Sequence, residues 1–210
     1  SPLTRRGTWP RGMAETGWSL PEERWVESAC ALPTMTMSLA VSVTGKHPGR
    51  YLLEASLRAS EWGLPLMERP EKTPLGRCIG TLADAFLALG GNGWTLYDAQ
   101  GSLSFSPGMA AVRIKRLAAS QQAEDALVRL GELRPGDSVL DGTLGLGADA
   151  LVCARAVGST GRVLGVEASL PLYALASEGL RRSRFPFSAP IEVRHGKAGD
   201  VLSALSSGSV

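Results

Sequence analysis

The second half of the chain alternates between short apolar runs and longer stretches with helical spacing. The short runs predict three strands, over residues 139–141, 162–166 and 191–195. Apolar residues at helical spacing predict helices over 148–154, 171–182 and 201–205. Strands that alternate with helices in this order form parallel sheets with helical crossovers. The pattern therefore predicts a Rossmann-like α/β domain over residues 107–210, with only the front half of such a sheet.

The first half has a more mixed pattern and predicts a small α/β module over residues 37–106. Strand formers cover residues 39–44, and apolar residues at helical spacing cover 51–62 and 75–89. A hairpin is predicted after these elements, with its turn at Asp98–Gly101. Such a module either positions a substrate or caps the neighbouring sheet.

Residues 1–36 lack a regular pattern, because prolines interrupt every stretch long enough for a helix. They are predicted to be an irregular or disordered extension. Tryptophans and arginines are interleaved within this segment, so a basic RNA-binding arm is the functional alternative. Short basic stretches are more often simply solvated.

The segment from Ser138 to Ala150 combines a strand, a tight turn and the start of a helix. The turn carries three glycines, Gly142, Gly145 and Gly147. Glycines let the backbone pass close beneath a ligand, and the first turn of the following helix presents unpaired N–H groups and a positive dipole end. The segment therefore predicts a nucleotide-type binding loop.

Two kinds of ligand compete for this loop. A dinucleotide motif of the Gly-x-Gly-x-x-Gly/Ala type can be fitted to Gly145, Gly147 and Ala150, which would indicate an NAD-dependent oxidoreductase. The strand, however, ends in Asp141, which places a negative charge where the pyrophosphate would lie. A carboxylate there repels phosphate and suits a cationic amino-acid ligand.

The next two predicted strands also end near acidic residues. Glu167 lies twenty residues after Gly147, about the interval at which an acidic side chain reaches ribose hydroxyls in such folds. Asp200 follows the third strand, where it can accept a hydrogen bond from an adenine amino group. Three acidic strand ends suit S-adenosylmethionine better than NAD.

Each of these residues also has a purely structural interpretation. Asp141 can cap the following helix, and Thr143 can either cap the turn or contact the ligand carboxylate. Glu167 taken alone is a surface acid, and Gly199-Asp200 is also an ordinary turn sequence.

These motifs resemble those of class I S-adenosylmethionine-dependent methyltransferases. The resemblance rests on Asp-x-Thr-x-Gly-x-Gly over 141–147, on Glu167 and on Gly199-Asp200. The longer match L-D-G-T-L-G-L-G-A-D-A, followed by G-V-E-A-S-L-P-L, is similar to the family of small-subunit ribosomal RNA guanine-N2 methyltransferases. This resemblance implies S-adenosylmethionine as cofactor and the exocyclic amino group of a guanine in ribosomal RNA as substrate.

The same family carries an Asp-Pro motif on a fourth strand, and this chain has none after its third. We therefore expect residues 1–210 to be C-terminally truncated and inactive alone, with catalytic residues beyond Val210. A non-catalytic RNA- or protein-binding module that keeps the loop is the alternative outside catalysis.

A predicted helix over 107–117 brings together three cations, Arg113, Lys115 and Arg116. Cations at this spacing can neutralise RNA phosphates, although a solvated helix face is the simpler interpretation. A second short helix is predicted over 124–133.

Composition adds few constraints. A formal net charge of +2 neither demands nor opposes a nucleic-acid partner. Three widely spaced cysteines and two histidines argue against a structural zinc site or another metal, and they favour a reducing compartment. No apolar run approaches membrane-spanning length, so no membrane partner is expected and the cytoplasm is the predicted location.

Overall fold

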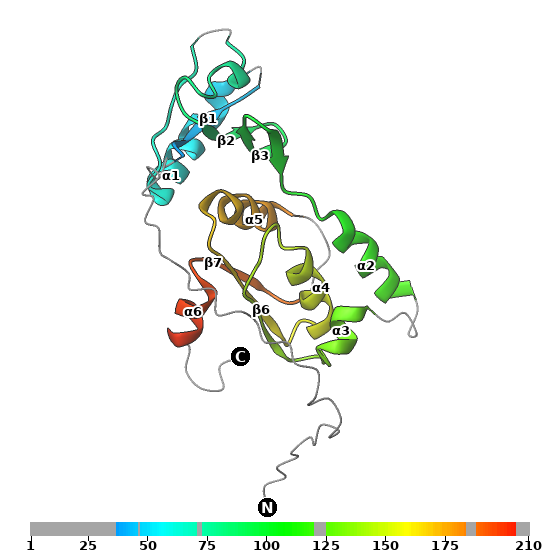
Figure 1. The fold of residues 1–210 in the computed structure, drawn as a ribbon. Helices are drawn as coiled ribbons and strands as arrows, with labels where there is room; N and C mark the ends of the chain where they lie inside the picture. The colour runs from blue at the N-terminus through cyan, green and yellow to red at the C-terminus, as the bar shows by residue number, and fades with distance from the viewer. Residues whose placement is uncertain (1–36, 46, 71–72, 120–124, 184–187, 205–210) are drawn as a thin grey trace, which may run out of the picture. The chain divides into compact units, whose positions relative to one another are not determined.

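A computed structural model describes residues 37–45, 47–70, 73–119, 125–183 and 188–204, which form two β-sheets with flanking helices (Figure 1). The first sheet has four strands and the second has three. The extension predicted over residues 1–36 lies outside the described residues.

The four-stranded sheet has the order β1-β2-β3-β4. Its strands are β1 (Leu39–Val43), β2 (Ala85–Gly90), β3 (Gly93–Asp98) and β4 (Gly101–Ser104). β1 and β2 are parallel, whereas the pairs β2–β3 and β3–β4 are antiparallel. The connection from β1 to β2 contains the 3-10 helix η1 (Pro48–Tyr51), helix α1 (Leu52–Trp62) and the 3-10 helix η2 (Leu75–Arg77).

Most of this module matches the sequence expectation. Helix α1 ends at Gly63 in the left-handed conformation, the usual way to close a helix. The predicted hairpin turn forms between β3 and β4, where the Asp98 carboxylate accepts the N–H groups of Gln100 and Gly101 at 2.8 and 3.0 Å. An aspartate at this place stabilises a turn by satisfying backbone donors.

The predicted helix over 75–89 is wrong. Only a single turn forms there, η2, and the chain then becomes strand β2. Gly80 adopts a positive φ of 76°, which interrupts helical geometry. All six residues of β2 are buried between β1 and β3, so tertiary packing outweighs the helix propensity of its alanines and leucines.

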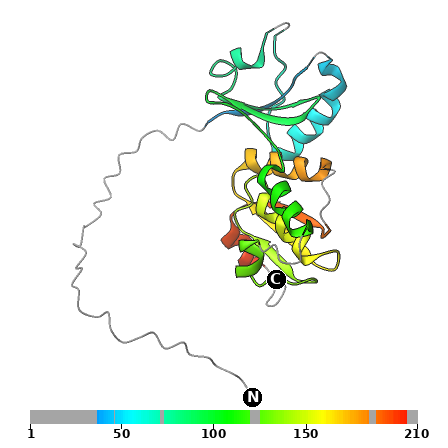
Figure 2. The ribbon, with the colours of Figure 1, turned by 90° about the vertical axis from the view of Figure 1, so that its right-hand side faces the viewer.

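The three-stranded sheet is parallel, as predicted, and its strands have the order β5-β6-β7. Its strands are β5 (Ser138–Asp141), β6 (Arg162–Glu167) and β7 (Ile191–His195). Helices α4 (Ala148–Val157), α5 (Leu170–Arg182) and α6 (Ala198–Ala204) follow the strands in turn. Figure 2 shows the alternation of strand and helix in this half of the chain. The Rossmann-like arrangement brings the carboxyl ends of all three strands to one edge.

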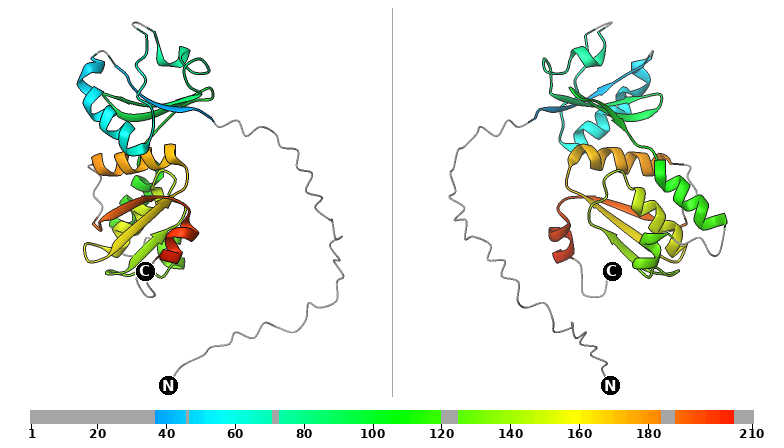
Figure 3. Two further views of the ribbon diagram at one scale, coloured as in Figure 1. Left: turned by 90° about the vertical axis from the view of Figure 1, so that its left-hand side faces the viewer. Right: turned by 45° about the vertical axis from the view of Figure 1, so that its right-hand side comes forward.

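Two further helices, α2 (Gly108–Ala119) and α3 (Ala126–Leu130), precede this sheet. Figure 3 shows α2 beside α4, in line with their shared core around Ala110, Ile114 and Leu151. Ion pairs of Arg113 on α2 stabilise this packing. Its guanidinium contacts both oxygens of Asp125 at 2.7 and 2.8 Å and reaches Asp149 of α4 at 2.5 Å.

Helix α5 connects the two halves of the described chain. Its residues Ala174 and Leu175 are fully buried in a core that also contains Leu87, Trp62 and Trp94. The two indole rings meet edge to face with centroids 4.8 Å apart. The sequence boundary near residue 107 therefore separates two sheets that share a hydrophobic core, and the division into domains stays a prediction.

An ion cluster around one buried carboxylate lies beside this core. The Glu178 side chain of α5 is only 5% exposed and contacts Arg58 of α1 at 2.7 Å, Arg181 at 2.5 Å and Arg182 at 3.4 Å. Glu54 of α1 contacts Arg181 and Arg182 in turn. Helices α1 and α5 are therefore joined by ion pairs as well as by apolar packing.

Candidate functional site

The loop between β5 and α4 is fixed against the neighbouring strand β6. The Leu144 N–H donates to the Val166 carbonyl at 3.0 Å, and the Leu144 side chain is buried. A Cβ at Gly165 would come within 2.6 Å of that side chain, so glycine at this position lets Leu144 pack closely against β6. Gly145 and Gly147 adopt positive φ values of 53° and 79°, which explains two of the three loop glycines.

Glu167 fastens the same loop from the end of β6. One carboxylate oxygen accepts the Gly145 N–H at 2.8 Å, and the other accepts the N–H of Ser169, the N-cap of α5, at 2.8 Å. A carboxylate offers about four acceptor positions, so both oxygens can still accept a further hydrogen bond. The side chain therefore organises the loop and remains able to bind ligand hydroxyls.

Asp141 lies half-buried at the end of β5. Its carboxylate accepts the Thr143 N–H at 3.1 Å, while the N-cap of α4 is Gly147, which receives no side-chain cap. The helix-capping interpretation of Asp141 is therefore wrong. Burial raises the pKa of the Asp141 carboxyl above its usual 3.8, and the charges of Asp149 and Glu167 act in the same direction.

Asp200 lies at the same edge of the sheet, in the first turn of α6, and is exposed. Helix α6 approaches the loop at Ala198, whose side chain would be 3.1 Å from a Cβ at Gly142. Among the described residues, Asp200 makes no hydrogen bond to Asp141 or Glu167. The structure therefore places six of the predicted residues together at this edge, and Asp200 lies near them without a direct contact. The six are Asp141, Gly142, Thr143, Gly145, Gly147 and Glu167.

Two residues near this edge, His195 and Tyr173, are not among the predicted site residues. His195 ends β7 directly across from Glu167 in the parallel register, and its Nε2 lies 3.1 Å from the Ala168 carbonyl oxygen. Its ring lies against Tyr173 of α5 with centroids 5.3 Å apart. Both partners are more than twenty residues away in sequence, so only the strand register brings them to His195.

The three predicted phosphate-binding cations do not act together. Arg113 is taken up by Asp125 and Asp149, which raise the pKa of its guanidinium. Lys115 and Arg116, by contrast, are exposed on α2. The structure assigns Arg113 a structural role in place of the predicted phosphate contact.

The residues at the sheet edge fit S-adenosylmethionine. The carboxylates of Asp149 and Glu167 are close enough to influence the ionisation of Asp141. A cationic group placed there relieves their mutual repulsion, whereas a pyrophosphate adds to it. The cofactor carries an ammonium and a sulfonium, which match this charge.

None of the described helices is both long and apolar enough to cross a bilayer. No group of three or more His, Cys, Asp or Glu side chains in the described ranges is placed to share a metal ion.

The chain was compared with known protein families and curated proteins. Residues 111–200 match the family model of protein-L-isoaspartate(D-aspartate) O-methyltransferase. The chain is also 32% identical over 139 residues to the "Uncharacterized protein YpiP" of Bacillus subtilis (strain 168), covering 65% of this chain and 53% of that protein. The chain thus spans about half the length of this curated relative.

Solved structures show weaker likeness. TrmN from Thermus thermophilus is 23% identical with a TM-score of 0.35, covering 80% of this chain and 48% of that one. A SAM-dependent O-methyltransferase from Thermotoga maritima is 25% identical with a TM-score of 0.30, covering 48% and 40%. Scores this low carry no argument. The family-model match supports a class I S-adenosylmethionine-dependent methyltransferase fold in residues 111–200.

Proposed function

We propose that this chain binds S-adenosylmethionine at the carboxyl edge of its parallel sheet and serves methyl transfer to RNA. Asp141, Gly142, Thr143, Gly145, Gly147, Glu167 and Asp200 form the proposed cofactor site. The observation that carries the proposal is the half-buried Asp141 carboxylate, whose pKa is raised beside two further acids. A cationic ligand next to this carboxylate would stabilise its ionised form.

The proposed roles follow from position. Asp141, at the end of β5, faces the ligand's ammonium group, and the backbone of the Gly142–Gly147 loop lies against its amino-acid part. Glu167, at the end of β6, accepts from the ribose hydroxyls while keeping its bonds to the loop amides. Asp200, beyond β7, accepts from the adenine amino group. The bound cofactor supplies the reactive methyl group.

An NAD-dependent oxidoreductase is the less favoured alternative. It needs a dinucleotide pyrophosphate at the loop, where Asp141 contributes negative charge. The family-model match to a methyltransferase over residues 111–200 also favours methyl transfer over oxidoreduction.

The proposed substrate is the exocyclic amino group of a guanine in ribosomal RNA. Its support is the sequence resemblance to guanine-N2 methyltransferases and the two exposed cations of α2, Lys115 and Arg116. No described residue is assigned as a catalytic base, so the contribution of this chain is to bind and align the reactants. A non-catalytic RNA-binding module would use the same cations.

Replacing Lys115 and Arg116 together by glutamine tests the RNA part of this proposal. If both neutralise phosphates of single-stranded RNA, the variant binds more weakly and its log–log salt slope becomes shallower by about 1.4. The binding constant is measured between 50 and 200 mM salt. Arg50 and Arg77, exposed in the first module, give a charge-matched control double variant that keeps the wild-type slope. If the salt slope of the Lys115/Arg116 variant is unchanged, these two side chains do not contact RNA and are only solvent-exposed.

A further inference from the structure

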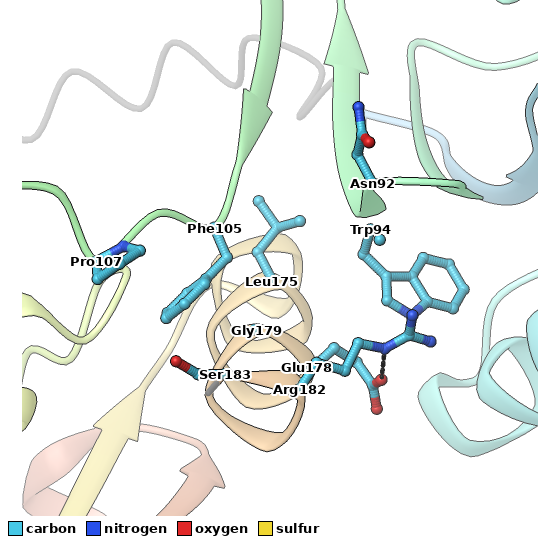
Figure 4. Close-up of a pocket in the computed structure, with 10 residues that line it drawn as sticks. Asn92, Trp94, Phe105, Pro107, Leu175, Glu178, Gly179, Arg182 and Ser183 are labelled. Atoms are coloured by element: carbon cyan, nitrogen blue, oxygen red, sulfur yellow. Dashed lines mark ion pairs between the residues drawn. The ribbon is translucent and has the colours of Figure 1, made fainter. Parts of the chain in front are cut away.

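The ion pairs of Arg113 border the proposed cofactor site. Arg113 of α2 contacts Asp149 in the first turn of α4, two residues after Gly147 of the cofactor loop. The ion cluster around Glu178 lies elsewhere. Its Arg182 contacts Glu178 at 3.4 Å beside the pocket in Figure 4, and none of the described residues that line this pocket belongs to the proposed cofactor site.

The Arg113 guanidinium is fixed between two carboxylates of unequal burial. Its Nε and Nη2 donate to both oxygens of Asp125, whose side chain is 9% exposed. A two-pronged contact of this kind sets the plane of the guanidinium. Its Nη1 then donates to Asp149, whose side chain is 60% exposed, at 2.5 Å. The positive charge is therefore held at one place, in contact with the first turn of α4.

Cys153 shows how far the charge of Arg113 reaches. This cysteine lies one turn along α4 from Asp149 and is 4% exposed. Burial, followed by the charges of Asp141 and Asp149, raises the pKa of its thiol to about 11, and the charge of Arg113 opposes this rise. Arg113 and Asp141 therefore act on the same buried group, from opposite sides of Asp149 in the balance of charge.

Only some of the titratable groups near Asp141 influence its ionisation. The groups at its edge of the sheet come from α4, from β6 and from the α6 segment, and they are Asp149, Cys153, Glu167, Lys197 and Asp200. Burial is the main cause of the raised pKa of the Asp141 carboxyl, and Asp149 and Glu167 add to it. Glu167 is bound by two backbone N–H groups, whereas Asp149 is paired with a full positive charge.

We propose that Arg113 is a positioning residue of the cofactor site, which holds the Asp149 carboxylate and offsets its charge, so that the negative charge of Asp141 stays available for the cationic cofactor. The proposal rests on the proposed S-adenosylmethionine site and adds to it a residue that acts through Asp149. Neighbouring carboxylates disfavour each other's ionisation, and a guanidinium paired with one of them lowers the cost of charging the other. Helix α2 thereby supports the cofactor loop.

The test is the titration of the Asp141 carboxyl, followed by 13C NMR in the ligand-free chain labelled with 13C-aspartate. Its signal is identified as the one missing from D141N. In R113Q the titration midpoint should rise by about 0.5 pH unit, because a positive charge is lost beside Asp149. Adding D149N to R113Q should return the midpoint to the wild-type value or below it. A midpoint that R113Q leaves in place, or that D149N does not bring back, would overturn the proposal.

A second variant covers the stability of the fold. R113Q leaves the Asp125 carboxylate unpaired, which is expected to destabilise the chain. R113Q/D125N removes this carboxylate as well, and asparagine at position 125 still caps α3. The midpoint of Asp141 should rise here too, because at Cys153 the charge of Arg113 outweighs that of Asp125. R155Q is the charge-matched control at the opposite end of α4, and should move the midpoint by less than about 0.2 pH unit.

The affinity for S-adenosylmethionine, measured against pH on the same variants, separates this proposal from the proposed function. If the cofactor binds at Asp141, its affinity falls on acidification at a higher pH in R113Q than in the wild type, in step with the midpoint. Midpoints that move as expected while the affinity profile does not follow would contradict the proposed cofactor site and support the role of Arg113. Unmoved midpoints with normal cofactor binding would overturn the role of Arg113 alone.

Discussion

Asp141→Asn is expected to reduce S-adenosylmethionine affinity by at least about thirtyfold, because it removes a partly buried charge opposite a cationic ligand. Stability should not fall with it. Burial and two neighbouring acids raise the pKa of Asp141 in the folded chain, so ionising this carboxyl costs more there than in the unfolded chain. The neutral variant avoids that cost and should melt at or above the wild-type temperature. Affinity by calorimetry and melting by circular dichroism measure the two effects.

The pH dependence follows with a defined sign. A carboxyl whose pKa is raised on folding stabilises the fold at low pH and loses that contribution as the pH rises through the raised pKa. Ligand binding runs the other way. Wild-type affinity should weaken on acidification, starting above the ordinary aspartate pKa of 3.8, and the variant should lack this dependence.

Asp137→Asn is the matched control for this prediction. Asp137 precedes the opposite end of β5, where its carboxylate accepts the Arg134 N–H at 2.7 Å. The same chemical change there should leave cofactor affinity within about twofold, since the charge lies outside the site. Equal losses in both variants would mean that Asp141 acts through the strand rather than on the ligand.

Glu178→Gln is expected to lower the free energy of unfolding by about 2 kcal/mol. The variant leaves three arginines, Arg58, Arg181 and Arg182, without the buried carboxylate that they share. Only the Glu178 carboxylate is buried, and the neutral amide would replace its charge-assisted hydrogen bonds to these arginines with weaker ones. Urea unfolding followed by fluorescence gives the value.

Glu61→Gln provides the comparison at the edge of the same cluster. The Glu61 side chain is 52% exposed and contacts only Arg58 among the described ion pairs. Its loss should cost less than about 1 kcal/mol, as is usual for solvent-exposed pairs. If Glu178→Gln costs no more than Glu61→Gln, the contact between α1 and α5 is held by its apolar core alone.

The sequence predicted the parallel half of the fold well because several signals agree there. The apolar runs ending at Asp141 and Glu167 are short, and glycines or helical stretches separate them. The two acids then meet the loop because parallel strands end at one edge. Local pattern and topology together were enough to place this part of the site.

Elsewhere local pattern and tertiary environment disagree. The apolar run Ala85–Gly90 has no polar face, so its burial on both sides as a strand could not be distinguished from a helix. Arg113 appeared equivalent to Lys115 and Arg116 until the fold brought Asp149 to it from α4.

The most direct test of the account is a binding titration of this chain at neutral pH with S-adenosylmethionine and, in parallel, with NADH. The account predicts saturable binding of S-adenosylmethionine and a raised melting temperature in its presence, with no effect of NADH. Binding of NADH without binding of S-adenosylmethionine, or binding of neither, would contradict it.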